Sequence, residues 1–203
     1  MDKKRIGIYG GTFSPPHIGH VGAAESFSRA ISPDELLIMP DFLPPHKQYD
    51  GEVTAEDRLE MSKLAFGHIE NAFISDMEIK RGGKSFTSVT LEELTSPNSE
   101  LYFLCGTDMF VTLEEWYRAP LIFKLAVICY VRRESDAEYD SITERLEKEY
   151  KEKYGARIIR IDSQVREISS TELRGALQSG SESARELLPE PVYDFIKERG
   201  LYR

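Results

Sequence analysis

Short apolar runs alternate with amphipathic helical segments along nearly the whole chain. Strands that alternate with helices favour a parallel sheet covered by helices on both faces, because each parallel strand pair needs a crossover connection. We therefore expect a doubly wound α/β fold. The runs that we expect to form its strands are residues 6–9, 36–39, 73–79, 101–105, 126–131 and 158–161.

Several of the expected helices have recognisable ends. Thr54 is a suitable N-cap for the helix that follows the second strand, and another helix is expected to begin near Thr87. The final helix is predicted to begin with Pro191 at its first position and to stop at Gly200. Residues 136–154 are highly charged, and we interpret them as a helix on a solvated surface.

Composition excludes several classes of function. The chain has 203 residues, which suits one domain, and its formal net charge is −9. An acidic chain lacks the basic surface that a nucleic-acid partner requires. Apolar runs are too short to span a membrane, and glycines follow the basic N-terminus where a secretory signal would be apolar. Cys105 and Cys129 lie in apolar runs and are interpreted as buried free thiols of a cytoplasmic protein.

A doubly wound sheet binds its ligands beyond the carboxyl ends of its strands. The loops after the first, second and fourth expected strands are therefore the candidate binding loops. They comprise residues 10–20, 40–47 and 106–108, and all three are rich in glycine, proline or polar residues.

The first of these loops carries the strongest local signal. Paired glycines allow a backbone to approach a ligand closely, and the helix that follows favours anions at its N-terminus. His17 and His20 are three positions apart, so both imidazoles lie on one face of the first helical turn. We predict a phosphate pocket in which these two histidines stabilise developing charge. Its further candidate residues are Gly10, Gly11, Thr12 and Phe13.

A second anion site is expected near the C-terminus. Hydroxyls and free amides at a helix start bind anions, and Arg174 shares a helix face with Ser170 and Thr171. Taken alone, this segment is an ordinary helix cap, but together with the first loop it supplies the second half of a triphosphate clamp. The segment begins with Ile168 and Ser169.

Two common nucleotide-binding motifs are absent from the sequence. No third glycine follows Gly10 and Gly11 at the spacing of the dinucleotide fingerprint. Residues 82–85 have the tail of a Walker A loop, but Glu78 stands where its first glycine would be. We interpret residues 82–84 as a turn.

The two motifs together resemble those of the nucleotidylyltransferase superfamily. His17 and His20 match its (H/T)xGH signature, and residues 168–174 match its ISSTxxR element. The remaining matches narrow the resemblance to the bacterial nicotinate-mononucleotide adenylyltransferases and span the chain in order. They are residues 44–47, 85–87 and 106–108, Trp116, and the ending 188–202.

This resemblance implies a Rossmann-like domain over residues 1–203, with a core of about 1–165 and a small helical part of about 166–203. It implies transfer of the adenylyl group of ATP to nicotinate mononucleotide in NAD biosynthesis, with magnesium carried on ATP. His17 and His20 would hold the ATP phosphates. The remaining implied roles are Ser170, Thr171 and Arg174 at the triphosphate, Gly106 and Asp108 beside the adenosine, Thr87 and Trp116 at the pyridine ring, and Lys47 near the mononucleotide.

The sequence departs from the family pattern at two positions. The family usually has Asp where this chain has Ser14, and often Tyr where it has Phe86. The first change removes a carboxylate beside the phosphate loop, and the second removes a hydroxyl but keeps the ring. Neither change affects the histidines.

Three alternatives stay open. An adenylyltransferase of the same superfamily could act on nicotinamide mononucleotide or on pantetheine phosphate. A class I aminoacyl-tRNA synthetase fragment would share the HIGH sequence, but residues 61–63 occur too early for its lysine loop and the net charge disfavours tRNA. A non-catalytic nucleotide sensor would bind ATP without releasing pyrophosphate. The sequence also leaves open whether copies associate into a homo-oligomer.

Overall fold

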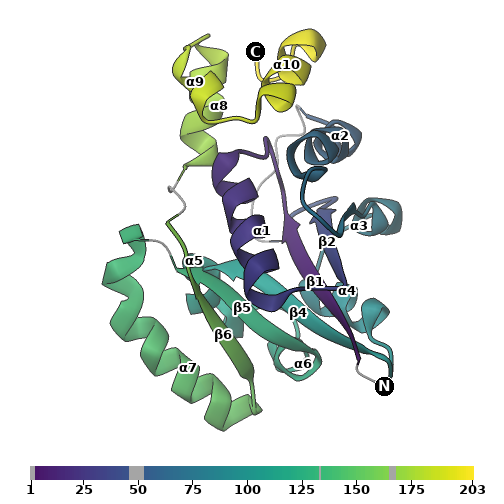
Figure 1. The fold of residues 1–203 in the computed structure, drawn as a ribbon, viewed down its shortest axis with the longest axis vertical. Helices are drawn as coiled ribbons and strands as arrows, with labels where there is room; N and C mark the ends of the chain where they lie inside the picture. The colour runs from purple at the N-terminus through teal and green to yellow at the C-terminus, as the bar shows by residue number, and fades with distance from the viewer. Residues whose placement is uncertain (1–2, 46–52, 133, 165–167) are drawn as a thin grey trace.

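A computed structural model describes residues 3–45, 53–132, 134–164 and 168–203. Within these residues, six parallel strands form one sheet in the order β3-β2-β1-β4-β5-β6, with helices on both faces (Figure 1). This arrangement confirms the doubly wound α/β fold. The strands are β1 (Lys4–Gly11), β2 (Glu35–Pro40), β3 (Ala72–Ile74), β4 (Ser99–Gly106), β5 (Ala126–Arg132) and β6 (Arg157–Asp162).

The helices divide between the two faces of the sheet. On one face lie α1 (Ile18–Ile31) and α2 (Ala55–Phe66), with α8 (Ser170–Gln178), α9 (Ser183–Glu186) and α10 (Glu190–Arg199) at the end of the molecule beyond β1 (Figure 1). The other face packs against α4 (Thr87–Leu94), α5 (Thr107–Val111), α6 (Ala119–Leu125) and α7 (Asp140–Tyr154). The remaining elements are α3 (Met77–Arg81) and the 3₁₀ turns η1 (Leu113–Glu115) and η2 (Glu134–Tyr139).

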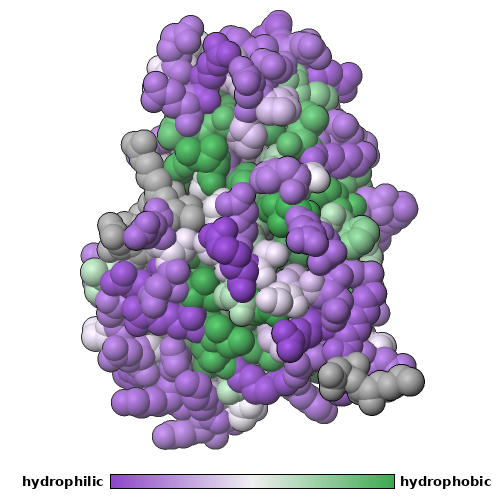
Figure 2. Space-filling model, in the orientation of Figure 1, coloured by the Kyte–Doolittle hydropathy of each residue, from purple (hydrophilic) through white to green (hydrophobic). Residues whose placement is uncertain are grey.

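The central strands are buried on both sides. In β4, Leu104 belongs to the apolar cluster under α1, whereas Phe103 and Cys105 belong to the cluster under α5 and α6. Successive strand residues point to opposite faces, so an unbroken apolar run supplies two cores at once. Figure 2 shows hydrophilic side chains over most of the face that carries α1, with hydrophobic ones visible between the helices.

The prediction of a strand over residues 73–79 is wrong beyond Ile74. β3 pairs with β2 over only three residues, and the Ser75 amide donates to the Ile38 carbonyl before the chain leaves the sheet. Residues from Met77 then form α3, which buries Glu78 against α4. The alternation of apolar and polar residues is compatible with a long strand and also with a short strand followed by a helix. β3 lies at the edge of the sheet and ends early.

The helix predicted over residues 136–154 begins later and is less solvated than expected. A 3₁₀ turn precedes α7, whose Thr143, Leu146 and Tyr150 are buried. α7 thus has one apolar face, which its many charged residues obscure in the sequence.

The C-terminal helices share an apolar core with the sheet. Leu173, Val192 and Ile196 join the same cluster as Phe13 and Phe66. The helix α9 was not expected from the sequence, and Pro191 occupies the second position of α10 because that helix begins at Glu190. The division near residue 165 stays a prediction.

No helix among the described residues is long and apolar enough to span a membrane. Cys105 and Cys129 are buried free thiols, as expected from the sequence. Burial raises the pKa of the Cys129 thiol to about 12, and it raises that of Cys105 as well.

Candidate active site

A cavity of about 590 Å³ opens at the carboxyl ends of β1, β2 and β4. This size is in the usual range for small-molecule sites. The cavity brings together every candidate site residue that the structure describes, and Lys47 lies outside the described residues. The candidates lining it are Gly10, Gly11, Thr12, Phe13, His17, His20, Thr87, Gly106, Asp108, Trp116, Ile168, Ser169, Ser170, Thr171 and Arg174.

The loop after β1 is shaped by close packing. A Cβ at Gly11 would lie 2.9 Å from the Phe13 ring, so no larger residue fits there without moving that ring. Phe13 has a φ of 47° and its ring is buried edge-on against Tyr9, Phe66 and His20. A Cβ at Gly10, in contrast, would meet only the Met39 carbonyl oxygen, at 4.0 Å. The Gly10 backbone therefore leaves room for a ligand.

His17 and His20 cap helix α1 reciprocally. His17 is the N-cap residue, and its Nδ1 accepts the His20 amide at 3.3 Å. The His20 Nδ1 accepts the His17 amide, also at 3.3 Å. The two rings stack with their centroids 3.6 Å apart. This is a capping box built from two imidazoles in place of the usual hydroxyl and carboxylate.

The caps define which ring nitrogen is available for chemistry. A main-chain N–H can only donate, so each Nδ1 must accept. In a neutral imidazole the proton then lies on Nε2. The Nε2 of His17 lies 3.3 Å from the Ser170 hydroxyl, which links the two phosphate motifs. Each neutral ring therefore carries an Nε2 proton that it can donate.

The second motif begins helix α8. Ser169 is its N-cap, and the Ser169 hydroxyl accepts the Glu172 amide at 3.3 Å. Arg174 donates to the Ser14 carbonyl at 3.1 Å and to the Thr171 hydroxyl at 3.2 Å. Arg174 thus connects α8 to the loop after β1, and its guanidinium lines the same cavity as the histidines.

The end of β4 contributes a carboxylate. Asp108 is exposed at the start of α5, and a Cβ at Gly106 would lie 2.7 Å from its Oδ1. Glycine therefore allows the Asp108 carboxylate to approach the strand end closely.

Thr87 and Trp116 lie on a further wall of the cavity. Thr87 is the first residue of α4, whose N-cap is Phe86 and lacks a side-chain capping bond. Trp116 is half-buried and packs edge-on against Phe103 at a centroid distance of 6.2 Å. Their arrangement offers a ring, a hydroxyl and a helix start at one place.

Further polar residues that were not assigned to the site from the sequence also line the cavity, among them Asp41, Glu78 and Tyr202. Asp41 directly follows β2, so the rule about strand ends could have found it. Glu78 was expected on a strand and is instead buried on α3, where it accepts the Thr90 hydroxyl. Burial raises the pKa of the Glu78 carboxyl above its ordinary 4.5, against the opposing effect of the Thr90 and Ser85 hydrogen bonds. Tyr202 is near the C-terminus, and its hydroxyl lies 2.9 Å from that of Ser14.

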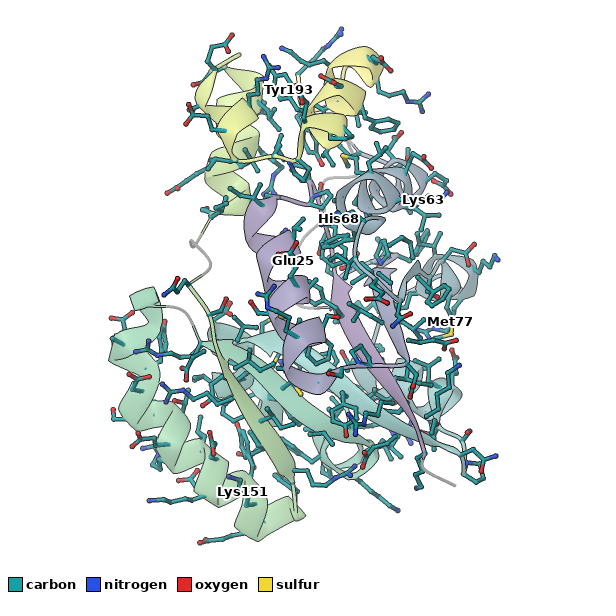
Figure 3. The ribbon with its side chains drawn as sticks, viewed as in Figure 1. Glu25, Lys63, His68, Met77, Lys151 and Tyr193 are labelled. Carbon is teal, nitrogen blue, oxygen red and sulfur yellow. The ribbon has the colours of Figure 1, made fainter. Side chains whose placement is uncertain are left out.

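His68 lies away from this cavity. It follows α2, and Figure 3 shows it beside Glu25 of α1, with Nε2 and the Glu25 carboxylate 3.2 Å apart. Its side chain is more than half exposed.

The model of the cytidylyltransferase-like family matches residues 8–176 of this chain. A "Probable nicotinate-nucleotide adenylyltransferase" of Listeria monocytogenes serotype 4a (strain HCC23) is 33% identical over 205 residues, covering 98% of both chains. The chain belongs to the cytidylyltransferase-like family and, within it, to the nicotinate-nucleotide adenylyltransferases. A relative of the same name from Desulfatibacillum aliphaticivorans is 36% identical over 220 residues, covering 98% of this chain and 99% of its own.

A solved structure shares the fold of this family member. The nicotinic acid mononucleotide adenylyltransferase of Plasmodium falciparum, complexed with NaAD, superposes with a TM-score of 0.79 at 19% identity. The match covers 98% of this chain and 97% of the other. The Rossmann-like nucleotidylyltransferase fold expected from the sequence is confirmed.

Proposed function

We propose that this chain transfers the adenylyl group of ATP to nicotinate mononucleotide, giving deamido-NAD and pyrophosphate. The observation that carries the proposal is the junction of the two phosphate motifs, where His17 and Ser170 meet in one cavity. Membership in the nicotinate-nucleotide adenylyltransferases supports the choice of acceptor.

The reaction needs little covalent chemistry from the protein. An oxygen of the acceptor phosphate forms a bond to the α-phosphorus of ATP, and the bond to the bridging oxygen of pyrophosphate breaks. A phosphate monoester is already ionised near neutral pH, so a strong general base is unnecessary. Catalysis then consists of positioning the two substrates and stabilising charge on the phosphate oxygens.

The hydrogen-bond donors that would stabilise this charge come from both phosphate motifs. We assign the Nε2 protons of His17 and His20 to the phosphate oxygens on which charge develops. Arg174 offers a planar fork for the β- and γ-phosphates, and the free amides at the start of α8 add further donors. Asp108 lies at the end of β4 that faces the adenosine in this assignment.

Magnesium carried with ATP would neutralise phosphate charge. The Asp108 carboxylate lines the same cavity, on the side assigned to the adenosine. One carboxylate suits an ion that keeps several waters and binds mainly through substrate phosphates. Among the described residues, no group of three or more His, Cys, Asp or Glu side chains could hold a metal ion.

The pyridine carboxylate is assigned to the wall formed by Thr87 and Trp116. A carboxylate only accepts hydrogen bonds, whereas an amide also donates them. The Thr87 hydroxyl and the free amides at the start of α4 are donors, and the indole of Trp116 can stack on the ring. This environment favours nicotinate over nicotinamide. We further propose a cytoplasmic enzyme, in keeping with its two free thiols.

Pyrophosphate release tests the proposal. The purified chain is incubated with ATP and magnesium, and with nicotinate mononucleotide, nicotinamide mononucleotide, pantetheine phosphate or no acceptor. We expect rapid release only with nicotinate mononucleotide. Faster release with either of the other acceptors would assign the chain to that reaction instead. ATP binding without release in any mixture would identify a nucleotide sensor.

A further inference from the structure

A buried arginine connects two loops of the cavity. Arg58 lies on α2, and its side chain is fully buried. Its Nη1 donates to the Thr12 carbonyl at 2.9 Å and to the Asp41 carboxylate at 3.1 Å. Its Nη2 donates to the Phe42 carbonyl at 3.1 Å. All three acceptors belong to the loops after β1 and β2.

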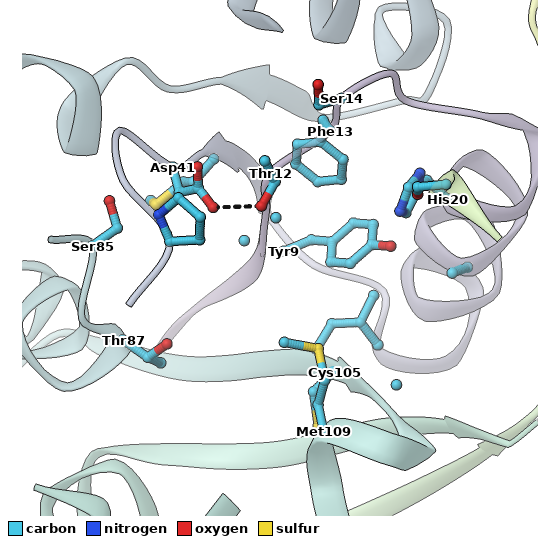
Figure 4. A pocket seen from close by; sticks show the side chains of 18 of the residues that line it. Tyr9, Thr12, Phe13, Ser14, His20, Asp41, Ser85, Thr87, Cys105 and Met109 are labelled. Atoms are coloured by element: carbon cyan, nitrogen blue, oxygen red, sulfur yellow. Dashed lines mark hydrogen bonds between the residues drawn. The ribbon is translucent and has the colours of Figure 1, made fainter. Parts of the chain in front are cut away.

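The two loops are also bonded to each other. The Thr12 hydroxyl donates to the second oxygen of Asp41 at 2.8 Å, as Figure 4 shows. The Asp41 amide donates to the Gly11 carbonyl at 3.0 Å. Thr12, Asp41 and Arg58 thus form a cross-loop brace, in which both oxygens of one carboxylate are bonded.

Two members of the cross-loop brace line the cavity and the third supports them from behind. Thr12 and Asp41 are among the lining residues, and Arg58 is not. Gly10 and Gly11 precede Thr12 and Phe13 follows it, and the Asp41 loop continues into Pro44 and Pro45; all of these line the cavity. A shift of the brace would therefore move the lining residues of both loops together.

We propose that Arg58 is a positioning residue for adenylyl transfer, which holds the loop after β1 and the loop after β2 in register beside each other at the cavity. This inference rests on the proposed function. A buried guanidinium is costly unless it is paired, so the Asp41 carboxylate and the two carbonyl acceptors define its place closely. Its two terminal nitrogens together reach three acceptors, Thr12 and Asp41 through Nη1 and Phe42 through Nη2, a spread that the single nitrogen of a lysine does not reproduce.

The first test is Arg58→Lys, which keeps the charge and loses the fork. Misplacement of reacting groups by about 1 Å costs about 10²-fold in rate. We expect kcat/KM to fall about 10²-fold, with a higher KM for the acceptor. The Kd of a non-hydrolysable ATP analogue is expected to rise about tenfold. Measurements are made at a temperature where urea unfolding shows the variant to be folded.

Two smaller substitutions test the proposal even if Arg58→Lys does not fold. Thr12→Val removes only the hydroxyl that donates to Asp41, and Thr12→Ser keeps it. We expect Thr12→Val to lower kcat/KM about tenfold and Thr12→Ser, which keeps the hydroxyl, to lose clearly less. Thr143→Val is the control, because the Thr143 hydroxyl also donates a hydrogen bond, to the Asp140 carbonyl, yet Thr143 lies on α7 outside the cavity. It should leave kcat/KM unchanged.

The double variant separates bracing from direct ligand contact. If Thr12 and Arg58 act through one brace, the combined loss in Thr12→Val/Arg58→Lys is smaller than the product of the two single losses. Independent losses that multiply would contradict the proposal. So would a folded Arg58→Lys variant with wild-type kcat/KM and analogue affinity, or equal effects of Thr12→Val and Thr143→Val.

Failure of the proposed function gives a different result. In that case wild type releases no pyrophosphate with nicotinate mononucleotide, while the brace is still tested with whichever acceptor is active. Should no acceptor be active, the analogue Kd alone decides, because it requires no reaction. An unchanged Kd in both Arg58→Lys and Thr12→Val would then overturn the positioning role.

Discussion

At the scale of single residues, the two histidines cap helix α1 with one ring nitrogen and offer the other ring nitrogen to the phosphates. Their Nδ1 atoms cap α1, and this leaves the Nε2 protons as donors. Removing an imidazole therefore removes both a cap and a donor, and the two losses have to be separated before a kinetic effect is interpreted.

Replacing His17 by Asn separates them. Asn is among the best N-cap residues, so His17→Asn should keep the stability of α1 while losing the Nε2 donor. We expect kcat to fall about 10²-fold or more with little change in the free energy of unfolding. His17→Ala should lose similar activity and about 1 kcal/mol of stability as well. Kinetics and urea unfolding of both variants check this.

His68→Ala is the matched control for these variants. His68 is exposed and pairs with Glu25 outside the cavity, so its loss should leave kcat unchanged. A folded His17→Asn variant with normal turnover would contradict the assigned role of the histidines.

At the scale of elements, the packing of α3 against α4 buries a carboxyl group. Burial raises the pKa of Glu78 above 4.5, although the Thr90 and Ser85 hydrogen bonds and Arg81 oppose the shift. A carboxyl group with a raised pKa in the folded state favours folding at low pH. That contribution is complete below 4.5 and is lost as the pH rises through the raised value.

Glu78→Gln should remove this pH dependence. The amide oxygen can still accept the Thr90 hydroxyl, but the side chain no longer ionises. We expect the free energy of unfolding of Glu78→Gln, relative to wild type, to rise with pH above 4.5 and then level off. The gain is roughly 1.4 kcal/mol for each unit by which the pKa is raised. Urea unfolding across the pH range measures it, with Glu144→Gln on α7 as the exposed control.

The elements also show what sequence patterns can predict. Loops at strand ends were predictable because parallel strands end at one edge, and this rule located His17, Gly106 and Thr12. The position of Glu78 was not predictable. Whether this residue lies on a strand or on a helix depends on where β2 stops pairing with β3. Arg58 was hidden for another reason: nothing local distinguishes a buried arginine from an exposed one on an amphipathic helix.

At the scale of the whole molecule, the C-terminal helices complete the cavity from far along the chain. Arg174, Tyr202 and Ser170 all contact the loop after β1 or the histidine that follows it. Ser14 contacts two of them: its carbonyl accepts from Arg174, and its hydroxyl bonds Tyr202. Here Ser14, which departs from the family pattern, acts as a docking point for the C-terminal residues.

Removing the Tyr202 hydroxyl should loosen this docking. We expect Tyr202→Phe to cost about 1 kcal/mol of stability, the net value of a typical hydrogen bond. In a double-mutant cycle with Ser14→Ala, the coupling energy should be about 0.5–1.5 kcal/mol. Urea unfolding of the four proteins gives this quantity. A coupling energy near zero would mean that the two hydroxyls do not support each other.

The central claim is that the chain adenylylates nicotinate mononucleotide and selects it over its amide. The most direct measurement follows ATP labelled at its α-phosphorus, with kcat/KM determined for both mononucleotides. We predict label in a dinucleotide, formed in equal amount with pyrophosphate, and a preference for nicotinate of about tenfold to several thousandfold, since each mispaired buried polar group costs roughly 1–3 kcal/mol. Label that stays in ATP, or a kcat/KM ratio near one or favouring the amide, would contradict the account.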